Sequence, residues 1–235
     1  MIFYVFHFNI FRFIENTVMS TADQADEYTL GEELVHSISH GIGTLLSIAA
    51  LVLLIVRAAT HAPDGATAPC VVGFTIFGVT LFILYTMSTL YHSMLPRPAR
   101  YVFKILDHSA IYLLIAGTYT AFCLSILRGP MGWTLFGLIW GLAVFGVTMD
   151  SVYACRLTWL SIPLYLLMGW LVVIAIGPLL AVIPPLSLKF LVAGGIAYTV
   201  GAVFFIIDTK WLHAVWHFFV LAGSVLHFFA VFYAL

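Results

Sequence analysis

Long apolar runs separated by short polar connections make up nearly the whole chain. A helix needs about 20 mostly apolar residues to cross a bilayer, because the hydrocarbon is about 30 Å thick and each residue adds about 1.5 Å. Seven runs meet this requirement. Each is continuous rather than alternating, which favours helices over the strands of a barrel. The predicted spans are Leu34–Val56, Cys70–His92, Phe103–Ile126, Met131–Met149, Trp159–Ala181, Leu186–Ile207 and Leu212–Leu235.

These runs predict an all-α fold, an integral membrane bundle of seven transmembrane helices over residues 34–235, preceded by a cytoplasmic leader over residues 1–33. Composition supports this prediction: 63% of the residues are hydrophobic and 8% are charged, whereas a soluble domain carries about 25% charged residues. The net charge of −1 gives no basic face for nucleic acid. Cys70, Cys123 and Cys155 are isolated, without a CxxC pair. This spacing excludes a disulfide scaffold or a thiolate zinc site and favours buried apolar cysteines.

The distribution of lysine and arginine predicts the orientation of the bundle. Positions on the side of the N-terminus are Arg12, Arg97, Arg100, Lys104, Arg156 and Lys210, against Arg57, Arg128 and Lys189 on the other side. The excess predicts a cytoplasmic N-terminus. The first fourteen residues are aromatic but too short to span, so either they lie at the membrane interface or translation begins at Met19.

Several glycine, proline and aspartate residues lie within the predicted spans or at their ends. Gly137 with Gly141, and Gly194 with Gly195, are expected to allow close approach of helices. Gly177-Pro178 is expected to kink or end the fifth span. Asp150 and Asp208 read as loop charges.

Five polar residues gather at one predicted depth. Ser88 and His92 end the second span, Asp107 begins the third, and His213 and His217 begin the seventh. The alternation of the spans brings all five to the cytoplasmic face. Polar residues within membrane spans are costly and tend to be functional.

The spacing of these residues suits a metal ion. Ser88 with His92, and His213 with His217, are i,i+4 pairs that each project from one helix face. Three imidazoles from two helices give zinc three ligands and leave a fourth position for water, as in catalytic sites. Asp107 could orient that water or accept its proton, and Ser88 could bond His92 or the water. The alternative is a set of core or interfacial histidines without a metal, and Ala214 stands where an HExxH helix carries its glutamate.

Three blocks of sequence resemble the hemolysin III family, the bacterial branch of the group that contains the adiponectin and progestin receptors. They are Gly31-Glu-Glu-Leu-Val-His-Ser-Ile-Ser-His-Gly-Ile-Gly43, Ser88-Thr-Leu-Tyr-His92 with the segment 106–120, and His213-Ala-Val-Trp-His217 with the segment 219–223 and His227. The resemblance implies that His92, His213 and His217 are zinc ligands, that Asp107 holds the zinc-bound water and that Ser88 is an auxiliary polar residue. It also implies a multi-pass protein of the bacterial inner membrane with its N-terminus inside.

Other histidines are expected to have supporting roles. His36 and His40 are expected to pack helices or to support the surroundings of the metal, and the family usually has asparagine where His36 stands. His108 is expected to be structural, and His227 lies too far along its helix to share the metal. The resemblance, whose wider superfamily includes membrane hydrolases of lipid amides, points to a zinc-dependent hydrolase of a membrane-lipid amide or ester. The alternative is a non-enzymatic membrane sensor or cytolysin with structural zinc.

Overall fold

The computed structural model describes residues 28–207 and 209–235. The leader up to residue 27, with the aromatic segment and Met19, and Asp208 lie outside the described residues. The described chain forms helices and no strand: α2 (Leu30–His61), α3 (Thr67–Ser93), α4 (Arg97–Ser125), α5 (Pro130–Tyr153), α6 (Thr158–Trp170), the 3-10 helix η2 (Leu171–Ala175), α7 (Ile176–Val182), α8 (Pro185–Ile207) and α9 (Leu212–Phe232).

Seven spans in the described residues are long and apolar enough to cross a membrane, which confirms the predicted fold class. The fifth span is composite, because α6, η2 and α7 follow one another over Thr158–Val182. The irregular turn begins at Leu171, before Gly177-Pro178. Pro178 has no backbone N–H to donate, so the regular hydrogen bonds of the helix cannot continue through this position.

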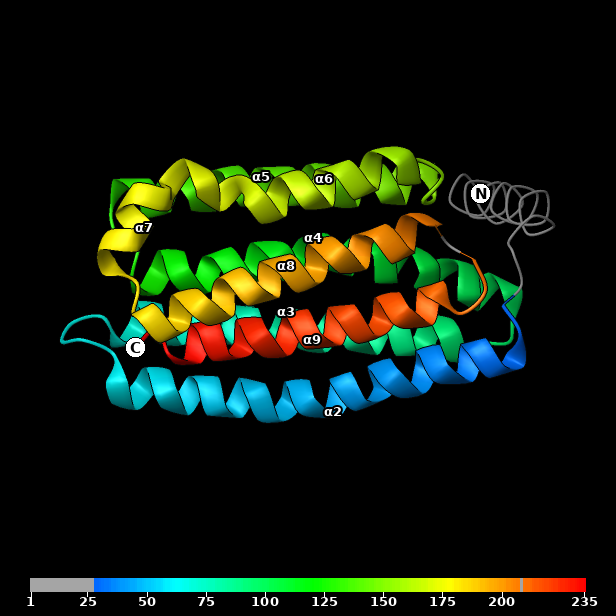
Figure 1. Ribbon diagram of the computed structural model, residues 1–235, viewed down its shortest axis with the longest axis horizontal. Helices are drawn as coiled ribbons and strands as arrows, with labels where there is room; N and C mark the ends of the chain where they lie inside the picture. The colour runs from blue at the N-terminus through cyan, green and yellow to red at the C-terminus, as the bar shows by residue number, and fades with distance from the viewer. Residues whose placement is uncertain (1–27, 208) are drawn as a thin grey trace, which may run out of the picture.

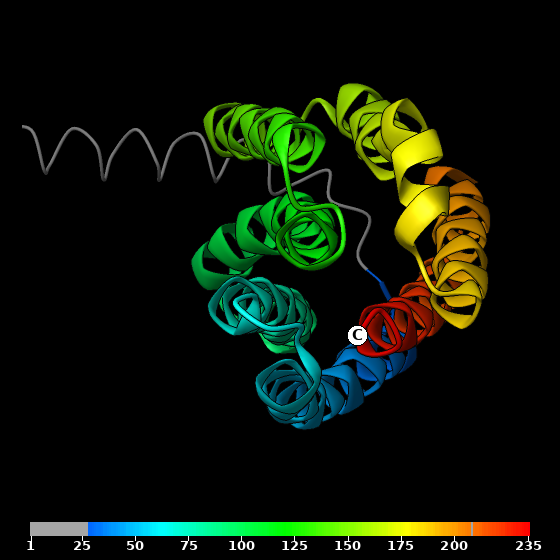
Figure 2. The same ribbon diagram turned by 90° about the vertical axis from the view of Figure 1, so that its left-hand side faces the viewer.

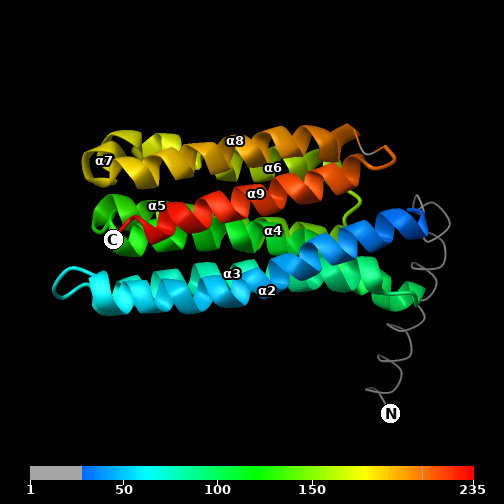
Figure 3. The same cartoon turned by 60° about the horizontal axis from the view of Figure 1, so that its bottom comes forward.

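The spans run up and down and are arranged as a ring (Figures 1 and 2). In the end-on view, α2 lies between α3 and α9, and the ring continues through α4 and α5 on one side and through α8 and α6 on the other. Figure 3 shows α9 beside α2 near the end of the molecule where both helices begin. The outer faces of the helices carry exposed Leu, Ile, Val, Phe and Trp side chains, as expected of surfaces that lipid solvates.

Local sequence explains where the helices begin and end. Thr29 and Glu32 form a capping box at the start of α2, which satisfies backbone donors that the first turn would leave unpaired. Pro130 opens α5 at a position where its missing N–H costs nothing. The helix then runs to Tyr153, so the prediction that Asp150 is a loop charge is wrong. Asp150 lies in the last turn of α5 with no exposed surface, because the helix continues past Met149, where the predicted span ended.

The glycine predictions have mixed outcomes. A Cβ atom on Gly194 would collide with the ring of His227, so this residue does allow close approach of α8 and α9. Gly137, Gly141 and Gly195 face open space, and a Cβ atom there would meet nothing within 4 Å in the described structure. The prediction that these three glycines pack helices together is therefore wrong.

Candidate metal centre

Three histidines from two helices converge at the end of the bundle where α2 and α9 begin and α3 ends, on the right of Figure 1. His92 ends α3, and His213 and His217 lie one turn apart at the start of α9. One ligand atom from each lies within 4.8 Å of the others. Their side chains are buried, with exposed fractions of 3%, 7% and 1%. The fold therefore brings together the three residues that the sequence singled out.

Glu33 on α2 makes a direct contact with this cluster. Its Oε2 atom lies 2.8 Å from Nδ1 of His92, and its Oε1 atom accepts a hydrogen bond from the guanidinium of Arg100 on α4. The carboxylate thus joins α2, α3 and α4. It is also close to His36, whose Nδ1 atom lies 4.0 Å from Oε2.

The neighbouring Glu32 fastens α2 to α9. Its Oε2 atom accepts hydrogen bonds from the amide and hydroxyl of Thr29, at 2.8 and 2.7 Å, and its Oε1 atom accepts one from the amide of Trp211 at 2.9 Å. Trp211 has a left-handed backbone (φ 66°) immediately before α9. The contact positions the start of α9 and, with it, His213.

The hydrogen bonds indicate which ring nitrogens face the centre. The Glu33 carboxylate accepts the Nδ1 proton of His92, which leaves Nε2 as the nitrogen with a free lone pair. That Nε2 atom is buried and has no hydrogen-bond partner among the described residues. On His217, Nδ1 lies 3.5 Å from the Ser39 hydroxyl, which itself donates to the carbonyl of His36. A buried imidazole nitrogen without a partner, among two more imidazoles, fits a metal ligand.

His36 and His40 extend the cluster of imidazoles. The ring of His36 has no exposed surface and lies with its centroid 4.6, 4.9 and 4.8 Å from those of His92, His213 and His217. The ring of His40 stacks on His217 at 3.7 Å. Glu33, His36 and His92 form a second group of ligating atoms within 4.8 Å of one another. The ring of His36 therefore lies against all three histidines of the cluster, and its role extends beyond packing α2 against neighbouring helices.

Ser88 and Asp107 form a neighbouring pair. Ser88 lies one turn before His92 on α3 and is buried, and its side chain lies near the Asp107 carboxyl on α4. Asp107 belongs to none of the groups of ligating atoms found among residues 28–207 and 209–235. Asp107 therefore lies near Ser88, which is one turn from His92, and outside the three-histidine cluster.

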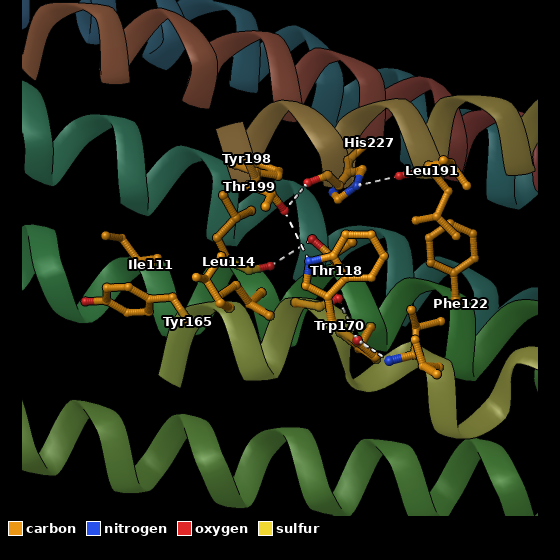
Figure 4. A pocket seen from close by; sticks show the side chains of 18 of the residues that line it. Ile111, Leu114, Thr118, Phe122, Tyr165, Trp170, Leu191, Tyr198, Thr199 and His227 are labelled. Atoms are coloured by element: carbon orange, nitrogen blue, oxygen red, sulfur yellow. Dashed lines mark hydrogen bonds between the residues drawn. The ribbon is translucent and has the colours of Figure 1, made fainter. Parts of the chain in front are cut away.

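An apolar cavity of about 220 Å³ lies inside the ring of helices (Figure 4). Its lining reaches from Phe205 and Trp216, near the histidines, to Leu127 and Leu188 at the opposite end of the bundle. The ring of Phe205 lies 5.7 Å from that of His213, centroid to centroid. Few polar groups face the cavity, and the hydroxyl of Thr199 already accepts a hydrogen bond from Trp170 at 3.1 Å. The cavity therefore offers a long apolar space that ends beside the histidines.

The remaining histidines lie elsewhere. His227 lines the cavity and approaches the carbonyl of Leu191 at 3.3 Å (Figure 4), well along α9 from the cluster. His108 is buried in α4 and groups with Asp150 and Cys155 rather than with the three histidines. Cys70, Cys123 and Cys155 are free and buried, as expected.

Sequence reasoning did not identify Glu33 as part of the site. The signal was present: Thr29 followed three residues later by Glu32 is the pattern of a capping box. That pattern places Glu33 in the first turn of the helix, on the same end of the bundle as His92.

Comparison with known proteins identifies the family. The sequence model of the Haemolysin-III related family matches residues 28–228. Hemolysin-3 of Bacillus cereus is 49% identical over 206 residues, which cover 87% of this chain and 92% of that protein. The Hemolysin-3 homolog of Bacillus subtilis is 46% identical over 205 residues, covering 87% and 94%. The monocyte to macrophage differentiation factor of Homo sapiens is 28% identical over 166 residues, covering 66% and 67%. The chain belongs to the Haemolysin-III related family and is a multi-pass membrane protein with groups of residues that could hold a metal ion.

Proposed function

We propose that His92, His213 and His217 bind one Zn²⁺ and that the protein hydrolyses an amide or ester bond of a membrane lipid. The observation that carries the proposal is the buried Nε2 atom of His92, which has no partner among the described residues while Glu33 occupies the other ring nitrogen. Nitrogen ligands in a set of three are typical of catalytic zinc, which keeps an open position.

The residues around the cluster support hydrolysis. Bound zinc would lower the pKa of a water molecule to about 7 and so supply a nucleophile at neutral pH. Asp107 would provide a carboxyl that accepts a proton from the attacking water, and the nearby Ser88 hydroxyl would orient that carboxyl. Glu33 holds His92 in the tautomer that presents Nε2, and Arg100 in turn holds Glu33.

The apolar cavity supports a lipid as the substrate. Its lining runs through the bundle and ends at Phe205, beside His213. An acyl chain in this space would place a polar amide or ester group at the histidine cluster. Burial of the acyl chain would supply binding energy in proportion to the apolar area removed from water.

The proposed location is the bacterial inner membrane with the N-terminus in the cytoplasm. Arg97, Arg100, Lys104, Arg156 and Lys210 lie at the end of the bundle that holds the histidines. Excess lysine and arginine mark the cytoplasmic side, so the proposed site faces the cytoplasm.

A lipidomic comparison tests the proposed reaction. Membranes from cells that make the protein, cells that make the His213→Ala variant and cells without it are analysed side by side. Depletion of a lipid amide or ester, with release of its fatty acid, is expected only with the unaltered protein. If the three lipid profiles are the same while the purified protein holds zinc, the non-enzymatic reading, a sensor or cytolysin with structural zinc, is favoured instead.

A further inference from the structure

A second group of ligating side chains lies outside the histidine cluster. It combines His108 of α4, Asp150 of α5 and Cys155 of the connection between α5 and α6. One nitrogen, one oxygen and one sulfur atom from these residues lie within 4.8 Å of one another. The exposed fractions of the three residues are 8%, 0% and 5%. The cysteine spacing argued against a thiolate zinc site, because no CxxC pair is present. The fold instead brings one isolated cysteine together with residues from two other segments.

The backbone turns sharply to bring Cys155 to Asp150. Ala154 and Cys155 both adopt the left-handed conformation, with φ of 54° and 57°. This conformation is costly for residues that carry a Cβ atom, and it persists only where the surroundings enforce it. The amide of Cys155 then donates to the carbonyl of Asp150 at 3.1 Å. The chain thus folds back on the end of α5 and buries the thiol beside the carboxyl group.

The carboxyl group of Asp150 is held in place by two hydroxyl groups of α6. Ser161 donates to Oδ1 at 2.8 Å, and the hydroxyl of Tyr165 lies 3.3 Å from Oδ2 and 3.0 Å from the carbonyl of His108. A carboxylate has about four lone-pair positions, so these two contacts leave positions for a cation. Hydrogen bonds of this kind orient the ligands of metal sites.

We propose that His108, Asp150 and Cys155 bind a second divalent transition-metal ion, separate from the three-histidine cluster. A set of one imidazole, one carboxylate and one thiolate suits zinc and, in the laboratory, cobalt. Ligands about 2.0 to 2.3 Å from a tetrahedral ion lie about 3.3 to 3.8 Å apart. The three ligand atoms now lie within 4.8 Å of one another, and small side-chain rotations would bring them to the separation of a tetrahedral site. The fourth position on the ion would be left for water.

Binding at this site requires loss of the thiol proton. Burial, together with the nearby Asp150 carboxyl, raises the pKa of Cys155 to about 12, so the side chain is a neutral thiol in the absence of a cation. Coordination forms the bond from sulfur to the metal and releases this proton to solvent, with no change of oxidation state. The bound cation would offset the negative charge that a thiolate and a carboxylate bring into a buried space.

Cobalt(II) provides a probe that separates the two sites. The full-length protein is purified in detergent, stripped of metal and titrated with cobalt(II). Only a sulfur ligand gives the thiolate-to-cobalt charge-transfer absorption in the near ultraviolet, and the three-histidine cluster has no sulfur. The unaltered protein is expected to bind about two ions per chain and to show this absorption.

Three variants assign the absorption. Cys155→Ser is expected to abolish the charge-transfer absorption and to reduce cobalt binding to about one ion per chain. Cys123→Ser removes another buried thiol and is expected to keep both the absorption and the two bound ions. His213→Ala is expected to keep the absorption even though it damages the other site. Absence of the absorption from the unaltered protein at excess cobalt would overturn the proposal without any variant. Its persistence in Cys155→Ser would overturn it as well.

Discussion

The Nδ1 atom of His92 lies 2.8 Å from Oε2 of Glu33, and this contact determines which nitrogen of His92 faces the other histidines. Glu33 is itself held by Arg100. Through these two contacts, Glu33 links the capped start of α2 to the end of α3 and the start of α4. Partners of this kind orient metal ligands and typically change metal affinity by about 10- to 100-fold when removed.

Glu33→Ala should lower zinc affinity by about 10- to 100-fold, because His92 loses the acceptor that selects its tautomer. Glu33→Gln should have a smaller effect, since the amide oxygen can still accept the Nδ1 proton. Competition with a zinc-binding dye in detergent measures both affinities. Asp64→Asn is the control, because Asp64 is exposed in the connection between α2 and α3, at the opposite end of the bundle. Equal zinc affinity in Glu33→Ala and the unaltered protein would contradict the role given to Glu33.

Removal of a ligand should remove the metal. His213→Ala or His217→Ala should lose most of the bound zinc and melt at a lower temperature, because a metal bound only by the folded state stabilises it. His61→Ala is the control, since His61 is exposed at the opposite end of the bundle. Zinc content by mass spectrometry and thermal melting in detergent provide the two measurements. Full occupancy after both substitutions together would exclude these residues as ligands.

Adjacent glycines on α8 should respond differently to alanine. Gly194→Ala should destabilise the protein by about 1 to 3 kcal/mol, because the added carbon collides with the ring of His227. Gly195→Ala should be neutral or stabilise the protein by up to about 1 kcal/mol, because it faces open space and alanine favours the helix. Thermal melting of both variants tests the packing of α8 on α9. A destabilised Gly195→Ala with an unaffected Gly194→Ala would show that this packing is wrong.

The number of spans and the convergence of the histidines were predictable from the sequence. Apolar length determines the spans, and their alternation brings the end of the second span and the start of the seventh to the same membrane face. The contacts of Glu33 were not predictable in this way, because hydropathy began the first span at Leu34 and left Glu33 in the leader. The helix starts at Leu30 because a capping box, not hydropathy, determines its first turn. Asp150 was misplaced because the predicted fourth span ended at Met149, whereas α5 continues to Tyr153.

Orientation remains a prediction from the charges. A fluorescent protein that matures only in the cytoplasm should stay dark when fused after Leu235, because seven spans would carry the C-terminus outside. The same reporter fused after Leu95, in the connection between α3 and α4, should fluoresce. The reverse pattern would place the histidine cluster on the outer face and would rule out a cytoplasmic site.

The most direct test of the proposed reaction is hydrolysis by Asp107→Asn. Asparagine keeps the size of the side chain and can still face the Ser88 hydroxyl, but it cannot accept the proton of an attacking water. Assistance by a general base typically contributes about 10²- to 10⁴-fold to a rate. Vesicles that contain the purified, zinc-loaded protein are supplied with a ceramide as the lipid amide and a diacyl phospholipid as the lipid ester. The release of fatty acid is measured for the unaltered protein and for the variant. We predict that Asp107→Asn keeps its zinc and its melting temperature and loses nearly all release of fatty acid from the lipid that the unaltered protein cleaves. Equal release by both proteins, or no release by either while zinc is bound, would contradict the proposed hydrolase.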